Sequence, residues 1–190
     1  MKTKIRYEFK GEIAKTLSKG IKKLTEAVLE HMGLLEGGKN LTIEIHDNLL
    51  QALMPDGSYS YPAGMYEPGD KNRYVKISIA KIQEQLLVFR QQFPQLNLGF
   101  DVLLTSFFAH ELCHYVQDNK GGFPMPGEDA NVIYLDDPKA YSRLPHEMEA
   151  NIIGARFSGL RKSPVTLADI SAYESRDPKL RGTGFLRVEG

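Results

Sequence analysis

The sequence predicts an α+β domain in which a small sheet is backed by an N-terminal helix and followed by helices that carry the candidate chemistry. Three observations predict this fold: helically spaced apolar residues near the N-terminus, two short stretches that alternate apolar and polar residues, and one long segment that is apolar on almost every side. The chain has 190 residues, close to the prior of about 150 residues for one domain. We place this domain at residues 1–175 and a polar C-terminal tail at 176–190.

The N-terminal half should contain one helix and two strands. Apolar residues recur in steps of four and three along residues 11–31, which predicts an amphipathic helix; they are Ile13, Leu17, Ile21, Leu24 and Val28. Alternation of apolar and polar side chains predicts strands at 41–46 and 75–79. Between them, residues 55–73 are rich in proline, glycine and tyrosine, which predicts a long loop that has room for a short strand.

The C-terminal half should be helical. One amphipathic helix is expected at 82–93, and the next segment, 98–118, is apolar nearly all round, which predicts a buried helix. Residues 119–144 are rich in glycine, proline and aspartate and should be irregular. A proline at the first position favours a helix at 145–157, and the Ser-Pro pair at 163–164 favours a short final one.

The composition excludes several classes of function. Lys and Arg together number 24, as do Asp and Glu, so the formal net charge is zero. A chain without a basic excess is a poor candidate for binding nucleic-acid phosphates or an anionic membrane surface. Cys113 is the sole cysteine, which excludes an internal disulfide. No segment is apolar enough for a transmembrane helix or a secretory signal, so we expect a cytoplasmic protein.

The buried helix carries a motif that is typical of metal-dependent hydrolases. Residues 110–114 read His-Glu-Leu-Cys-His. A helix turns about 100° per residue, so His110 and His114 lie about 40° apart on one face and can reach the same ion. Glu111 lies to the side of this pair, where it can hydrogen-bond a metal-bound water without being a ligand. The pattern therefore predicts a zinc site with a neighbouring general base.

A catalytic zinc site needs a third protein ligand, and the helix expected at 145–157 offers three candidates. A helical wheel places Glu149 on the same face as the apolar residues of this helix, whereas Glu147 lies about 160° away, towards solvent. A carboxylate on the buried face needs a cation, so we favour Glu149 as the third ligand. His146, one turn earlier on the inward face, is the alternative.

The two segments together resemble a known family. His-Glu-Leu-x-His at 110–114, followed by Glu-x-Glu-Ala-Asn at 147–151, resembles the gluzincin group of zincin metallopeptidases. The match is most similar to the ImmA/IrrE-type peptidases and to minimal single-domain gluzincins. The resemblance implies a zincin-like fold with a small sheet, an active-site helix and a glutamate helix. It also implies that Zn2+ is the cofactor and that Glu149, which precedes Ala150, is the third ligand.

The expected activity is hydrolysis of a peptide or protein substrate. Glu111 would act as the general base towards the metal-activated water. Tyr141, Arg143 and His146, which lie just before or at the start of the second ligand helix, are candidates for oxyanion or substrate contacts. The strand at 74–80 is the candidate sheet edge for binding an extended peptide.

The sequence is also compatible with other interpretations. The chain could be a catalytically silent zinc-binding scaffold with a regulatory or interaction role, or a helical interaction protein in which the motif is accidental. Cys113 could be a fourth ligand that closes the site, but a helix-buried cysteine is more often a small apolar residue. The pair Asp136-Asp137 could contact calcium, but before a proline it is more typical of a turn.

Overall fold

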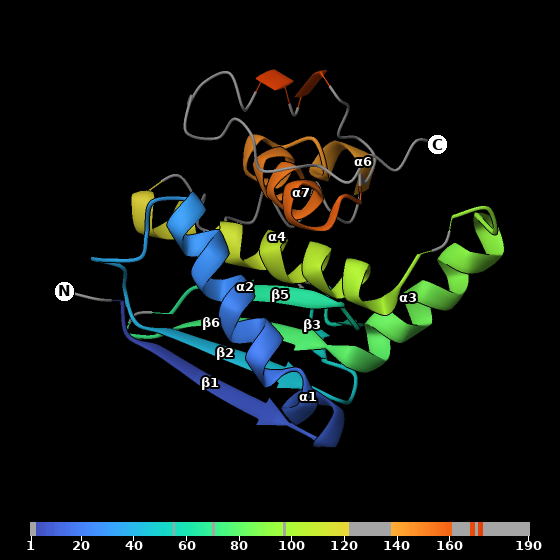
Figure 1. The fold of residues 1–190 in the computed structure, drawn as a ribbon, viewed down its shortest axis with the longest axis horizontal. Helices are drawn as coiled ribbons and strands as arrows, with labels where there is room; N and C mark the ends of the chain where they lie inside the picture. The colour runs from blue at the N-terminus through green and yellow to red at the C-terminus, as the bar shows by residue number, and fades with distance from the viewer. Residues whose placement is uncertain are drawn as a thin grey trace.

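Figure 1 shows the computed structural model of the chain. The structure describes residues 3–54, 56–69, 71–96, 98–121, 138–160, 168–169 and 171–172. Most of the segment expected to be irregular at 119–144, the start of the short helix expected at 163–164, the pair Asp136-Asp137 and the tail at 176–190 lie outside these residues. The described chain has the α+β class with a small mixed sheet that the sequence predicts.

The main sheet has four strands in the order β1-β2-β6-β5. Strands β1 (Ile5–Lys10), β2 (Leu41–His46) and β6 (Arg73–Ser78) are parallel, whereas β5 (Gly64–Glu67) runs antiparallel to β6 at the edge. A two-stranded sheet pairs β3 (Ala52–Leu53) with β4 (Tyr59–Ser60). The segment predicted as a long loop therefore holds both β4 and β5.

Alternation along the strands separates an apolar face from a charged face. The register aligns Tyr7 with Ile43 and Val75, and the next apolar row is Phe9, Ile45 and Ile77. The opposite face carries charged residues that pair with one another, for example the Lys10 ammonium with the Glu44 carboxylate at 2.7 Å. In the part of the chain that the structure describes, the long helices lie on the apolar side of the sheet (Figure 1).

The helices begin and end close to their predicted positions, with one break. The single helix predicted at 11–31 is two helices, α1 (Glu12–Thr16) and α2 (Ser18–His31), which meet at Leu17. Asp47 accepts hydrogen bonds from the backbone N–H groups of Ile13 and Ala14, which satisfies the first turn of α1. Asp47 therefore caps the start of α1, and the break follows one turn later, at Leu17.

The remaining helices follow the sheet in sequence. Helix α3 (Ile79–Gln92) starts directly after β6 because the Ser78 hydroxyl accepts from the Lys81 backbone N–H at 3.1 Å. Helix α4 (Phe100–Lys120) ends at Gly121, whose φ of 72° is the left-handed conformation that favours glycine. The described residues after it include helices α6 (Pro138–Tyr141) and α7 (Pro145–Ser158).

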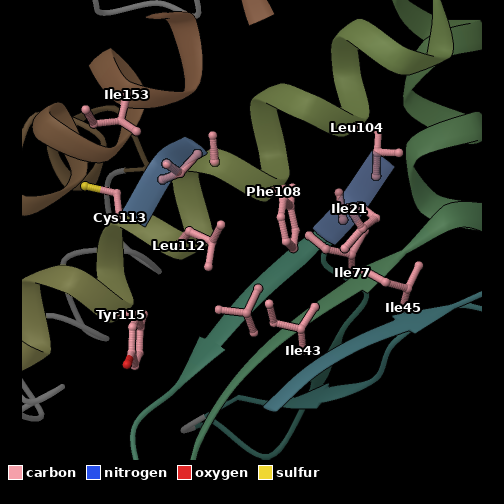
Figure 2. Packing of buried hydrophobic residues seen from close by; sticks show 14 of the residues in the cluster. Ile21, Ile43, Ile45, Ile77, Leu104, Phe108, Leu112, Cys113, Tyr115 and Ile153 are labelled. Carbon is pink, nitrogen blue, oxygen red and sulfur yellow. The ribbon is translucent and has the colours of Figure 1, made fainter. Parts of the chain in front are cut away.

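Helix α4 is the centre of the core. It packs on β5 and β6 with one side and on α7 with the other, and α2 lies beside it over the sheet (Figure 1). Phe108 and Leu112 point from α4 towards Ile43 and Ile77 of the sheet, as Figure 2 shows. A helix with neighbours on both sides has no exposed stripe, which explains why its sequence is apolar nearly all round.

Glycine lets α7 approach α4 closely. A Cβ added at Gly154 would lie 2.8 Å from the Ser106 backbone oxygen, too near for an ordinary contact. The first turn of α7 also lies against the middle of α4, where Glu147 contacts His110 and His114. Among the described residues, no helix is both long and apolar enough to cross a membrane.

Candidate metal centre

The two motif histidines converge at one point on α4. The Nε2 atoms of His110 and His114 lie 3.0 Å apart, and their rings meet edge to face with centroids 4.7 Å apart. Both rings are largely buried, on the side of α4 that faces α7. The helical spacing predicts this convergence, and the structure confirms it.

Glu147 from the first turn of α7 completes the group. Its Oε2 lies 3.3 Å from His110 Nε2, and its Oε1 lies 3.4 Å from His114 Nε2. One donor atom from each of the three residues can be chosen so that all lie within 4.8 Å of one another. Two imidazole nitrogens and one carboxylate oxygen are a suitable donor set for a divalent ion such as zinc. The group could therefore hold a metal ion, and its residues fit one chemically.

The structure brings Glu147, and not the predicted Glu149, to the histidine pair. The Glu149 carboxylate instead accepts a hydrogen bond from the Gln117 amide nitrogen at 2.9 Å. Glu147 was expected towards solvent, but only 6% of it is exposed. The helical wheel was misleading because α7 is buried on more than one side, so an apolar stripe does not define which side faces α4.

Opposing effects set the protonation of this group. Burial alone would lower the pKa of His114, but its hydrogen bond to Glu147 and the nearby carboxylates raise that pKa overall. Burial alone would raise the pKa of Glu147, but the two histidines hold it well below its usual value. Glu147 is therefore anionic, and its charge favours either a protonated imidazole or a bound cation beside it.

Glu111 occupies a tight position between α4 and the edge strand β5. It is buried, and it is not one of the three grouped ligands. A Cβ added at Gly64 would lie 2.8 Å from Glu111 Cγ and 3.0 Å from its Oε1. The missing side chain at Gly64 thus makes the space in which Glu111 lies. This role of Gly64 could not be predicted from the sequence, because it depends on which strand lies next to α4.

Two of the three predicted auxiliary residues lie beside the group. His146 Nε2 is 3.6 Å from Glu147 Oε1, and the His146 ring centroid is 6.0 Å from that of His114. The Tyr141 ring stacks edge to face on His146 at 6.2 Å. Burial lowers the pKa of His146, which favours its neutral form. Arg143, in contrast, is exposed in the turn between α6 and α7.

The strand at the edge of the sheet differs from the predicted one. The strand predicted as the sheet edge at 74–80 corresponds largely to β6, which is internal because β5 pairs with its outer side. The edge next to α4 is therefore β5.

Cys113 is buried in the apolar cluster near Ile153 of α7 and is not in the donor group, so it packs as a small apolar residue (Figure 2). Burial raises the pKa of its thiol well above the usual value.

Gln117 is a further site residue that sequence reasoning missed. It lies one turn after His114, and its amide contacts both that histidine and α7. Its three-residue spacing from His114 was the only available signal.

Comparisons with protein-family models, curated proteins and solved structures return no match for this chain.

Proposed function

We propose that the protein is a zinc-dependent peptidase with a zincin-like fold. The observation that carries this proposal is the convergence of His110, His114 and Glu147 on one point, with Glu111 on the same helix but outside the ligand group. Three protein ligands leave a fourth position for water or substrate, as a catalytic zinc site requires. The resemblance to gluzincins supports the same activity, with Glu147 in place of Glu149 as the carboxylate ligand.

The metal ion would be held by the two Nε2 atoms of His110 and His114 and by the Glu147 carboxylate. When bound, zinc lowers the pKa of a coordinated water towards about 7 and polarises a carbonyl group. Imidazole nitrogens and carboxylate oxygens also bind other divalent ions, but a buried site with two imidazoles and one carboxylate favours the binding of zinc.

Glu111 is the proposed general base. In its ionised form its carboxylate would take a proton from water and later deliver that proton to the amine of the leaving group. The side chain is enclosed between α4 and Gly64 of β5, so few alternative positions are open to it. Tyr141 and His146 lie beside the ligand group and would be the residues that contact an oxyanion or the substrate.

Strand β5 offers an edge for an extended peptide. The Ala63 carbonyl accepts from the Ser78 backbone N–H at 2.9 Å, and pairing then alternates along the strand. The backbone groups of Gly64 therefore point away from β6, on the side where β5 is the outermost strand of the sheet in the described part of the chain, and an added strand could pair with them there. This edge lies next to Glu111, so a peptide bound there would pass close to the proposed base.

One observation favours a second candidate, a metal-binding scaffold without hydrolytic activity. His146 lies beside Glu147 and close to the histidine pair. If its Nε2 took the fourth coordination position, the site would be closed, as structural zinc sites are.

Metal content and peptide cleavage together test the proposal. We expect purified wild-type protein to bind one zinc ion and to cleave members of a mixed peptide library detected by mass spectrometry. Glu111→Gln should retain zinc and lose cleavage, whereas Glu147→Gln should lose zinc. Glu84→Gln, a change on the exposed surface of α3, is the matched control and should change neither property.

The results separate the candidates. Zinc binding without cleavage of any library member would contradict the peptidase and support the silent scaffold. Cleavage that persists in Glu111→Gln would contradict the assignment of the general base. Absence of zinc from the wild-type protein, with no binding on addition, would contradict both candidates.

A further inference from the structure

Gln117 connects three groups at the junction of α4 and α7. Its side-chain oxygen lies 2.8 Å from His114 Nδ1. Its amide nitrogen donates to the His146 backbone oxygen and to Glu149 Oε2, each at 2.9 Å. Only 5% of Gln117 is exposed, so water competes little for these bonds.

These contacts fix the orientation of the amide. The nitrogen has two hydrogens, and two acceptors, a carbonyl oxygen and a carboxylate oxygen, lie next to it. A flipped amide would place its oxygen against both acceptors, which is unfavourable. The Gln117 oxygen must therefore face His114.

The fixed amide in turn determines which nitrogen of His114 carries a proton. An amide oxygen only accepts hydrogen bonds, so His114 Nδ1 must be the donor. In the neutral ring the other nitrogen, Nε2, then has its lone pair available. Nε2 is the atom that faces His110 and Glu147. The hydrogen bond that His114 Nδ1 donates to Gln117 thus selects the tautomer that can bind a metal.

We propose that Gln117 is a positioning residue for His114 and that Glu149 acts on the metal centre through Gln117. Glu149 holds the amide by accepting one of its two hydrogens, and the amide holds the imidazole. Helix α7 therefore contributes twice, with Glu147 as a direct ligand and Glu149 as a support for a ligand on α4. This inference rests on the proposed metal site and assigns a role to a carboxylate outside it.

Zinc affinity in a double-mutant cycle tests the connection. Loss of an outer-shell partner typically costs about 10- to 100-fold in metal affinity, so Gln117→Leu should weaken zinc binding by that factor. Glu149→Gln should weaken it less, because the amide oxygen that replaces the carboxylate oxygen can still accept from Gln117. If Glu149 acts through Gln117, then Glu149→Gln should have no further effect in the Gln117→Leu background. Affinity is measured by competition with a chromophoric chelator.

A matched control separates positioning from general stability. Asn119, also on α4, donates its amide to the Tyr115 backbone oxygen and accepts from the Lys39 backbone N–H, away from the metal centre. Asn119→Leu should lower stability and leave zinc affinity unchanged. An equal loss of zinc affinity in Asn119→Leu and Gln117→Leu would overturn the positioning role.

If Gln117→Leu does not fold, a second variant of the same residue, Gln117→Glu, can be used for the test. Gln117→Glu keeps an acceptor for His114 but places a carboxylate against Glu149. Adding Glu149→Gln removes that repulsion and should strengthen zinc binding in this background. Two results would show that Glu149 acts directly and would overturn the proposal. One is weaker zinc binding when Glu149→Gln is added to Gln117→Glu, and the other is an undiminished loss of zinc affinity when Glu149→Gln is added to Gln117→Leu.

The tautomer provides a readout that does not depend on hydrolysis. Long-range 1H–15N correlation spectra should show the His114 proton on Nδ1 in the zinc-loaded protein, and also in the metal-free protein at alkaline pH. Gln117→Leu should shift the metal-free ring towards the Nε2–H form. A proton on Nε2 in the wild-type protein would overturn the inference, whereas failure to cleave peptides would contradict only the proposed peptidase.

Discussion

Substituting alanine for Gly64 should disable the proposed general base and leave the metal ligands in place. The added Cβ would lie 2.8 Å from Glu111 Cγ. Carbon atoms in ordinary contact are about 3.5–4.0 Å apart, so Glu111 would have to move by about 0.7–1.2 Å. Cγ is close to the helix backbone, so rotation of the carboxylate alone cannot relieve the contact. Misplacement by about 1 Å can cost about 100-fold in rate, which is the loss we expect.

Initial rates on a cleaved peptide, zinc content and urea unfolding measure this outcome. Gly64→Ala should retain zinc and lose about 1–3 kcal/mol of unfolding free energy through overpacking. Gly20→Ala is the matched control, because a Cβ at Gly20 in α2 meets nothing within 4 Å. It should raise stability by about 0.5–1 kcal/mol with no change in rate. A folded, zinc-loaded Gly64→Ala protein with the wild-type rate would refute this account of Glu111.

Three other predictions concern packing, charge and metal. Gly154→Ala should destabilise the fold by about 1–3 kcal/mol and weaken zinc binding, measured by urea unfolding and chelator competition, because its Cβ would meet the Ser106 backbone oxygen at 2.8 Å. Burial alone would raise the pKa of Asp118, but the hydrogen bond from Arg73 lowers this pKa overall, below its ordinary value of 3.8. Ionised Asp118 therefore stabilises the fold at pH values above 3.8, and this contribution is lost as the pH falls from 3.8 through the lowered pKa. Asp118→Asn should therefore flatten the acid limb of the stability–pH curve; an unchanged limb would contradict the ion pair's role. Zinc at 100 times its dissociation constant should stabilise the protein by about 2.7 kcal/mol, seen as a higher melting temperature that a chelator reverses.

The sequence was most informative where the pattern was long. Helix α4 was predicted from its continuous apolar character, and the convergence of His110 and His114 follows from helical spacing alone. Strand β1 was missed, although Tyr7 and Phe9 alternate with charged residues. The short edge strand β5 was anticipated only as a possible strand within a loop, because its pairing depends on β6.

The identity of the third ligand could not be derived from one helix. A helical wheel orders the residues of α7 around its axis but does not show where α4 packs. The close crossing at Gly154 turns Glu147 towards the histidines and leaves Glu149 to Gln117. The same limit applies to Gly64, whose importance depends on a neighbour from another part of the chain.

Consecutive residues near the end of α4 are anchored in opposite directions. Gln117 is hydrogen-bonded to α7, whereas Asp118 accepts from the Tyr66 hydroxyl and from Arg73 Nε, each at 2.8 Å, on the side of the sheet. Rotation of α4 about its long axis would break one set of bonds or the other. We therefore expect the two imidazoles to keep their direction in the metal-free protein, so that an ion held by the proposed site could leave and return without refolding of the chain.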